Sequence, residues 1–211
     1  STVVTTLAGT GSSGSANGTG TSASFYRPVG ITTDGTNLYV ADYSNHLIRK
    51  IVISTGAVTT VAGTGSSGSA NGTGTSASFN YPSGITTDGT NLYVADSSNH
   101  LIRQIVISTG AVTTLAGTGS SGSANGTGTS ASFNSPFGIT TDGTNLYVAD
   151  SSNHLIRKIV ISTGAVTTLA GTGSSGSANG TGTSASFNYP GGITTDGTNL
   201  YVADFDNHLI R

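Results

Sequence analysis

The sequence predicts an all-β protein made of four copies of one four-stranded unit. A segment over residues 30–42 recurs without a change at 84–96, 138–150 and 192–204, so the period is 54 residues. Each copy places an Asp-Gly pair between two short apolar runs, which is typical of a β-hairpin. No stretch has helical periodicity. A repeat of about this length is typical of solenoids and propellers rather than of separate globular domains.

The repeat boundaries indicate a single domain over residues 1–211. The copies span approximately residues 5–58, 59–112, 113–166 and 167–211. Each unit is expected to bury its faces against its neighbours. The sequence starts with a lone copy of the fourth strand and stops inside the third strand of the last copy. We therefore expect the N-terminal strand to complete the last unit of this chain or of a partner chain.

Each repeat begins with a strand and a long polar loop. The run of residues 3–8 is rich in β-branched residues and predicts a short strand. Residues 9–24 are rich in Gly, Ser and Thr and would indicate a flexible linker if they occurred once. Because the loop recurs at a fixed length, we expect it to be ordered. A Phe closes every copy, and we expect its burial to pin the loop; these are Phe25, Phe79, Phe133 and Phe187.

The remaining strands follow in each repeat. In the first copy, the pattern predicts strands over residues 31–33, 38–41, 47–53 and 57–62. We expect a type I′ turn at Asp34 and Gly35, because Asp-Gly pairs supply the positive φ angles of that turn. Four short strands joined as a meander are typical of one blade of a β-propeller.

The last part of each repeat carries a specific motif. A pattern that starts with Pro-x-Gly-Ile ends with Tyr-Val-Ala-Asp-x-x-Asn-His-Leu-Ile-Arg in all four copies. Its Asn-His-Leu triplets begin at Asn45, Asn99, Asn153 and Asn207. On these residues the chain resembles the NHL-repeat family of β-propellers. The resemblance implies that residues 30–34 form the innermost strand of the first blade. It also implies strands over residues 37–42 and 46–53 and an outermost strand over residues 58–62.

The resemblance raises the question of ring closure. The family usually has six blades, whereas this chain encodes four. We expect self-association of two chains into one eight-bladed ring, with a single-chain four-bladed ring as the alternative.

Composition excludes several function classes. Charged residues make up 8% of the chain and the net charge is -2, which predicts no nucleic-acid partner. No apolar run has the length of a membrane span, so we expect no membrane partner. The chain has no Cys, which excludes disulfides and thiolate metal sites. We expect no cofactor, and of the open locations we favour a secreted or cell-surface bacterial one.

Two sequence patterns resemble ligand-binding sites, one for a dinucleotide and one for calcium. A structural role explains each of them better. Residues 9–14 match a G-x-G-x-x-G dinucleotide fingerprint, but the Gly-rich sequence that follows cannot form the helix this site requires. Asp34 lies in an Asp-Gly-Thr-Asn stretch without the distal Glu of a calcium loop. We expect no metal site.

The repeated His and Arg residues are predicted to be structural. His46 and its copies follow the second strand, where we expect a contact with Asp42 rather than metal ligation. If the hairpin of the second and third strands has a simple register, Arg49 lies opposite Tyr39 and forms a cation-π pair with it.

The positions at which the copies differ carry the functional prediction. Apart from a Leu7 to Val61 exchange, five of 45 aligned columns vary. They fall just before the first strand and in the loop between the second and third strands, which emerge at the same end of a blade. We expect this face to bind a ligand; neutral drift in tolerant loops is the alternative. The candidate residues are Tyr26, Arg27, Val29, Tyr43, Ser44, Tyr81, Ser83, Ser97, Ser135, Phe137, Ser151, Tyr189, Gly191, Phe205 and Asp206.

These observations favour a non-catalytic binding scaffold for a protein, peptide or glycan. The similarity of the copies indicates recent amplification or deliberate construction. A propeller enzyme is the alternative that the resemblance implies, since the family includes a lyase and similar propellers host metal-dependent hydrolases. Near-identical blades disfavour it, because catalysis needs unlike groups at one site. A purely architectural propeller without a ligand is the third candidate.

Overall fold

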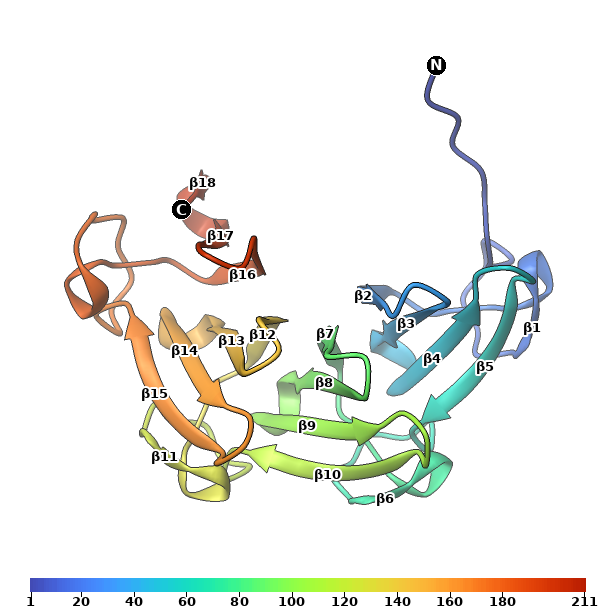
Figure 1. The fold of residues 1–211 in the computed structure, drawn as a ribbon, viewed down its shortest axis with the longest axis horizontal. Coiled ribbons are helices and arrows are strands. Elements are labelled where there is room, and N and C mark those ends of the chain that lie inside the picture. The colour runs from blue at the N-terminus through green and yellow to red at the C-terminus, as the bar shows by residue number, and fades with distance from the viewer.

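The computed structural model describes residues 1–211 and consists of four antiparallel sheets arranged about a common axis (Figure 1). This architecture is a β-propeller with one blade per repeat, as the sequence predicts. The sheet of the first blade has the order β1-β5-β4-β3-β2, with β2 innermost. Its strands are β1 (Gly18–Thr19), β2 (Pro28–Thr33), β3 (Asn37–Asp42), β4 (Leu47–Val52) and β5 (Ala57–Ala62).

The other blades repeat this sheet. The second contains β6 (Gly72–Thr73), β7 (Pro82–Thr87), β8 (Asn91–Asp96), β9 (Leu101–Val106) and β10 (Ala111–Ala116). The third contains β11 (Gly126–Thr127), β12 (Pro136–Thr141), β13 (Asn145–Asp150), β14 (Leu155–Val160) and β15 (Ala165–Ala170). The fourth has three strands, β16 (Pro190–Thr195), β17 (Leu200–Asp204) and β18 (Leu209–Ile210).

Short 3-10 turns are the helical elements of the chain. They span Gly20–Ser22, Tyr43–Asn45, Gly74–Ser76, Ser97–Asn99, Gly128–Ser130, Ser151–Asn153, Gly182–Ser184 and Phe205–Asn207. None of them has the length and apolar character that crossing a membrane requires.

The Gly-rich loop is ordered, which confirms the expectation from its fixed length. Its β1 segment pairs with the outer strand β5, where Gly18 lies opposite Val58. The backbone nitrogen of Gly20 donates to the carbonyl oxygen of Gly56 at 2.8 Å. Phe79 and Phe133, which end the equivalent loops, are fully buried. The loop therefore forms the outer rim of its own blade.

The tight turn between β2 and β3 differs from the type I′ turn that the sequence predicts. Gly35 has a φ of 90°, whereas Asp34 is not among the residues with positive φ, and a type I′ turn requires positive φ at both central residues. The Asp34 carboxylate instead accepts hydrogen bonds from the backbone nitrogens of Thr36 and Asn37, at 2.9 and 2.7 Å. Asp34 thus stabilises the turn through its side chain.

The predicted register of the hairpin from β3 to β4 is wrong by one residue. The structure pairs Val40 with Arg49 and Tyr39 with Lys50. The cause is the 3-10 turn at Tyr43–Asn45, after which His46 adopts a left-handed conformation with a φ of 55°. A shift of one residue moves a side chain to the other face of a sheet. Arg49 therefore lies over Phe25, with 5.0 Å between its guanidinium carbon and the ring centroid.

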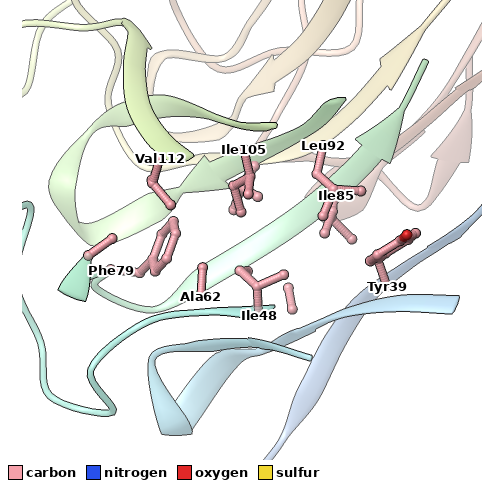
Figure 2. Close-up of a cluster of buried hydrophobic side chains, with 11 residues drawn as sticks. Tyr39, Ile48, Ala62, Phe79, Ile85, Leu92, Ile105 and Val112 are labelled. Carbon is pink, nitrogen blue, oxygen red and sulfur yellow. The ribbon is translucent and has the colours of Figure 1, made fainter. Parts of the chain in front are cut away.

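The core lies between successive blades. Figure 2 shows Tyr39 and Ile48 of the first blade facing Phe79, Ile85 and other apolar side chains of the second. An equivalent cluster joins the second and third blades, around Tyr93, Ile102 and Phe133. The second and third blades bury one face on the blade before them and the other on the blade after them, as expected for stacked repeats.

A glycine in each inner strand allows two blades to approach closely at the axis. A Cβ atom on Gly30 would collide with the carbonyl oxygen of Ser83 in β7. Gly84 and Gly138 meet the next blade in the same way. The inner strands accordingly pack in the order β2, β7, β12 and β16.

The first and last blades do not pack against each other in one chain. Figure 1 shows an opening between them, and the N-terminal residues project away from the sheets. The strand that the sequence predicts over residues 3–8 is absent in the single chain, because these residues have no neighbouring strand to pair with, and Val4 is 92% exposed. Within one chain the N-terminal residues therefore leave the last blade with three strands, and its completion by an N-terminal strand stays a prediction.

Candidate binding face

The two variable clusters lie side by side in every blade. The backbone nitrogen of Ser44, in the turn after β3, donates to the carbonyl oxygen of Tyr26, just before β2, at 3.0 Å. Asp206 donates to Asn188 at the same distance in the last blade. One end of the propeller therefore carries all five variable columns, and we refer to these fifteen sequence-predicted residues together as the loop face.

One column of the loop face has an unusual backbone. Arg27, Tyr81, Ser135 and Tyr189 all adopt left-handed φ angles, between 49° and 53°. Each precedes a proline. A left-handed conformation costs energy for residues other than Gly, and such residues cluster at ligand-binding positions. Four equivalent positions with three residue types, Arg, Tyr and Ser, therefore share this conformation.

A histidine of the preceding blade supports this strained position. The backbone nitrogen of Tyr81 donates to His46 Nδ1 at 3.1 Å, and that of Ser135 donates to His100 Nδ1 at 3.0 Å. The sequence instead predicts a contact between His46 and Asp42, which is wrong. The left-handed backbone at His46 directs its ring to the next blade, and other donors occupy the Asp42 carboxylate.

Aromatic rings gather where two blades meet. The ring centroids of Tyr43 and Tyr81 are 4.8 Å apart, and those of His46 and Tyr81 are 4.6 Å apart. His154 and Tyr189 repeat the second contact at 4.7 Å. These packed rings are fixed in orientation, yet Tyr81 and Tyr189 remain exposed. Exposed, rigid aromatic rings are typical anchors of binding surfaces.

The variable column at Val29 surrounds the propeller axis. A cavity of about 190 Å³ lies between the inner strands, and its lining includes Val29, Phe137 and Ile193. Val29 and Phe137 are exposed. The centre of the loop face is thus apolar, while the surrounding residues are Tyr, Arg, Asn and Ser.

Three of the predicted site residues serve the junction between blades. Ser83 and Ser97 are buried, and their hydroxyl oxygens lie 2.6 Å apart. The Ser97 hydroxyl donates to the carbonyl oxygen of Pro136 in the third blade, and Ser151 donates to that of Pro190 in the fourth. These serines join neighbouring blades. The exposed members of the loop face are Tyr26, Arg27, Val29, Tyr81, Phe137, Tyr189, Phe205 and Asp206.

Sequence reasoning missed a buried ionic cluster beneath the loop face. Arg49 Nη1 lies 2.9 Å from Asp42 Oδ2, and both side chains are fully buried. The same guanidinium donates to the carbonyl oxygens of Ser24 and Ala16 and to Asn17 Oδ1. Arg49 thereby fixes the Gly-rich loop against its own blade. The invariance of these residues in all four copies could have indicated the cluster.

Burial in this cluster also shifts the pKa of its carboxyl groups. Burial raises the pKa of Asp96, the equivalent residue of the second blade, while hydrogen bonds from Asn80 and Asn99 and the charge of Arg103 oppose the shift. Asp150 in the third blade shows the same direction for the same reason. Each carboxylate accepts hydrogen bonds from residues of its own blade, so its role is structural.

The opposite end of each blade has its own carboxylate. Tyr39 donates to Asp34 Oδ2 at 2.9 Å. Desolvation raises the pKa of Tyr39, the bond to Asp34 adds to this, and the pKa reaches about 12. The Asp-Gly-Thr-Asn turn at this end is identical in all four copies. No three His, Asp, Glu or Cys side chains gather as a metal site anywhere in the chain.

Comparison with known proteins identifies the repeat. A family model described as NHL repeat matches residues 25–51 and 79–105. NHL repeat-containing protein 2 from Homo sapiens is 33% identical over an alignment of 185 residues that covers 80% of this chain and 26% of that protein. The chain therefore spans about a quarter of the length of this relative.

Solved structures share the fold at lower identity. An auxiliary nutrient binding protein from Bacteroides ovatus superposes with a TM-score of 0.70 at 22% identity, covering 89% of this chain and 48% of that one. Virginiamycin B lyase from Staphylococcus aureus has a TM-score of 0.53 at 20% identity, covering 87% of this chain and 54% of that one. At these identities the likeness concerns the fold alone.

Proposed function

This chain belongs to the NHL-repeat family of β-propellers, and on that premise we propose that it is a non-catalytic scaffold whose loop face binds a protein, peptide or glycan. The observation that carries the proposal is the concentration of sequence variation on this face, since only the Leu7 to Val61 and Lys50 to Gln104 exchanges lie elsewhere in the repeat. At the other end, the Asp-Gly-Thr-Asn turn is identical in all four copies and the Ser-Thr-Gly turn in the three copies that contain it.

The chemistry of the loop face supports recognition of an uncharged or weakly charged ligand. Its exposed residues are mainly aromatic, with Arg27 and Asp206 as the charged members and half-buried serines beside them. Rigid aromatic rings bind with little loss of conformational freedom, and hydroxyl groups adapt to a range of hydrogen-bonding partners. The left-handed backbone at Tyr81 and Tyr189 holds these rings outward at an energetic cost.

The arrangement of ionisable groups supports a binding role over a catalytic one. Acid and base catalysis needs groups with separated pKa values at one site. Here the Asp and Arg residues of the buried cluster pair with each other inside each blade. The solved neighbours include both a nutrient binding protein and a lyase, so their names alone do not decide between the two roles.

A matched pair of substitutions tests the proposal. Screening the chain on glycan and peptide arrays should yield a ligand. The affinity for this ligand should fall in the Tyr81→Ser variant and should rise or change in the Ser135→Tyr variant. Both new residues already occupy this column elsewhere in the chain, so folding should persist. Thr90→Ser, in the exposed turn at the opposite end, is the control and should bind like the unmodified chain. Equal binding by all three variants would contradict the proposal.

A further inference from the structure

We propose that the open face of the first blade is an interface for a second copy of this chain. The last blade of that copy docks on it, and two such junctions close one eight-bladed ring. This inference concerns assembly and is independent of the ligand at the loop face.

The first blade presents one half of the standard junction between blades. Ile31 is 61% exposed, whereas its counterparts Ile85 and Ile139 are 5% and 6% exposed in the interior junctions. A pocket of about 420 Å³ lies beside Ile31, and its lining includes Phe25, Leu38 and Val29. In the interior junction, Tyr39, Ala41 and Ile48 of the preceding blade cover the equivalent residues. Figure 2 shows how such a face is filled.

The last blade presents the other half. Tyr201 is the counterpart of Tyr39 and is 44% exposed instead of 1%. Ile210 is the counterpart of Ile48 and is 77% exposed instead of fully buried. Gly192 has the open space that a neighbouring inner strand occupies at Gly30. The occupant that fits the first blade is therefore present on the chain itself, at its other end.

The polar groups at the two ends are complementary as well. His208 corresponds to His46, and its Nδ1 atom has no donor within the chain, while the backbone nitrogen of Arg27 has no acceptor. A junction from the last blade to the first would join them as His46 and Tyr81 are joined. The interior geometry thus predicts which atoms meet in the second copy.

The variable residues at this junction differ from those at the others. In the interior junction the ring of Tyr43 packs on Tyr81. The equivalent pair between copies is Phe205 and Arg27, which can form a cation-π contact. Asp206, next to Phe205, and Arg27 are the charged residues of the loop face and have opposite signs. Oppositely charged residues therefore lie on the first and the last blade, which meet in the proposed junction.

The unpaired strand edges also match. Residues 4–8 have the same sequence as residues 112–116 of the outer strand β10. In the first blade, Ile48 of β4 pairs with Ala62 of β5. The same register places Ala8 of one copy opposite Ile210 of the other. Pairing there supplies the last blade with its fourth strand and removes two exposed edges, which propellers otherwise avoid.

The separation of the two ends indicates a second copy rather than closure within one chain. The first and last blades lie apart in Figure 1, and the N-terminal residues point away from β18. Two copies provide eight blades, which is within the range of known propellers. A two-fold axis then makes both junctions identical, and the ring is closed.

The mass of the particle in solution tests the proposal. Light scattering of the chain at low micromolar concentration should give the mass of two chains. Ile31→Asp should reduce this mass to that of one chain while the circular dichroism spectrum of a β protein persists, because the side chain is exposed in one copy. Phe137→Asp, at an exposed apolar position outside the first and last blades, should keep the mass of two chains. Any other mass for the unmodified chain, or an Ile31→Asp variant that keeps the mass of two chains, would overturn the proposal.

Cysteine cross-linking separates the two modes of closure. The chain has no native Cys. When Ala8→Cys and Ile210→Cys variants are refolded together and oxidised, a disulfide product of two chains should form. The Ile48→Cys/Ala62→Cys variant is the internal control, and it should form a disulfide within one chain. If the control forms and the mixture gives no such product, or if Ala8→Cys/Ile210→Cys in one chain gives only monomer with an internal disulfide, the proposal is wrong.

Discussion

The Nδ1 atom of His46 accepts a hydrogen bond from the backbone nitrogen of Tyr81, 3.1 Å away in the next blade. Both residues have left-handed backbones, so the contact joins two locally strained loops. It gives the His of the Asn-His-Leu triplet a role in the packing of one repeat on the next. Since an acceptor nitrogen must be unprotonated, the contact depends on pH.

Acidification should weaken this junction. Burial lowers the pKa of His46 below its ordinary 6.5, so the folded state favours the neutral ring. The stability that the neutral ring contributes is present above 6.5 and is lost as the pH falls through the lower value of the folded state. His46→Asn keeps an acceptor near the Nδ1 position and does not titrate. Urea unfolding between about pH 7 and about pH 5 should show a smaller loss of stability for this variant; equal losses would contradict the assignment.

Alkaline titration should reveal the bond between Tyr39 and Asp34. Because the pKa of Tyr39 is raised to about 12 from 10.0, the protonated phenol contributes stability below 10.0, which is lost as the pH rises through about 12. Asp34→Asn removes the negative charge and should let Tyr39 ionise at lower pH. Phenolate absorbance during an alkaline titration measures this ionisation. Comparison with the Tyr39→Phe variant identifies the part of the absorbance change that comes from Tyr39. A curve that Asp34→Asn leaves unchanged would contradict the prediction.

Removal of the Arg49 guanidinium should release the Gly-rich loop. Arg49→Ala leaves the buried Asp42 carboxylate without its charged partner, and breaking such a pair costs about 3 to 5 kcal/mol. The melting temperature should fall, and a protease of broad specificity should cleave within residues 9–24. Lys50→Gln is the matched control, because Gln104 occupies this column in the second blade. An Arg49→Ala variant as resistant to cleavage as Lys50→Gln would show that other contacts hold the loop.

Exchange of charges should test the pairing of the two ends. Arg27→Asp or Asp206→Arg alone should lower the fraction of dimer, because two like charges would then meet at the junction between copies. The double variant restores opposite charges and should recover the dimer. Light scattering at low and high salt measures these fractions. If the double variant loses as much dimer as the two single variants together, these residues are not in contact.

Much of the fold could be predicted from the sequence because the repeat is local. The β3 strand has the bounds that the family resemblance implies, 37–42, and the sequence pattern alone comes within one residue of them at each end. The register of β3 with β4 could not be predicted. It depends on a 3-10 turn and on the left-handed backbone at His46, and non-Gly residues rarely adopt that conformation.

The candidate site was predictable in place and only partly in composition. The variable columns fall at one end because loops of a meander alternate between ends. Which of their side chains are exposed depends on the neighbouring blade. Ser83 and Ser97 occupy variable columns but are buried against the third blade, and no pattern within one repeat contains that contact.

The central claim is that the exposed aromatic residues of the loop face serve binding while the invariant residues hold the fold. Thermal melting of two variants tests it most directly. Tyr81→Ser/Tyr189→Ser should change the free energy of unfolding by no more than about 1 kcal/mol, because Ser135 already fills this column. Phe79→Ala removes a fully buried ring and should cost about 3 to 5 kcal/mol. A collapse of the first variant with an unaffected second would show that the loop face is structural and would contradict the account.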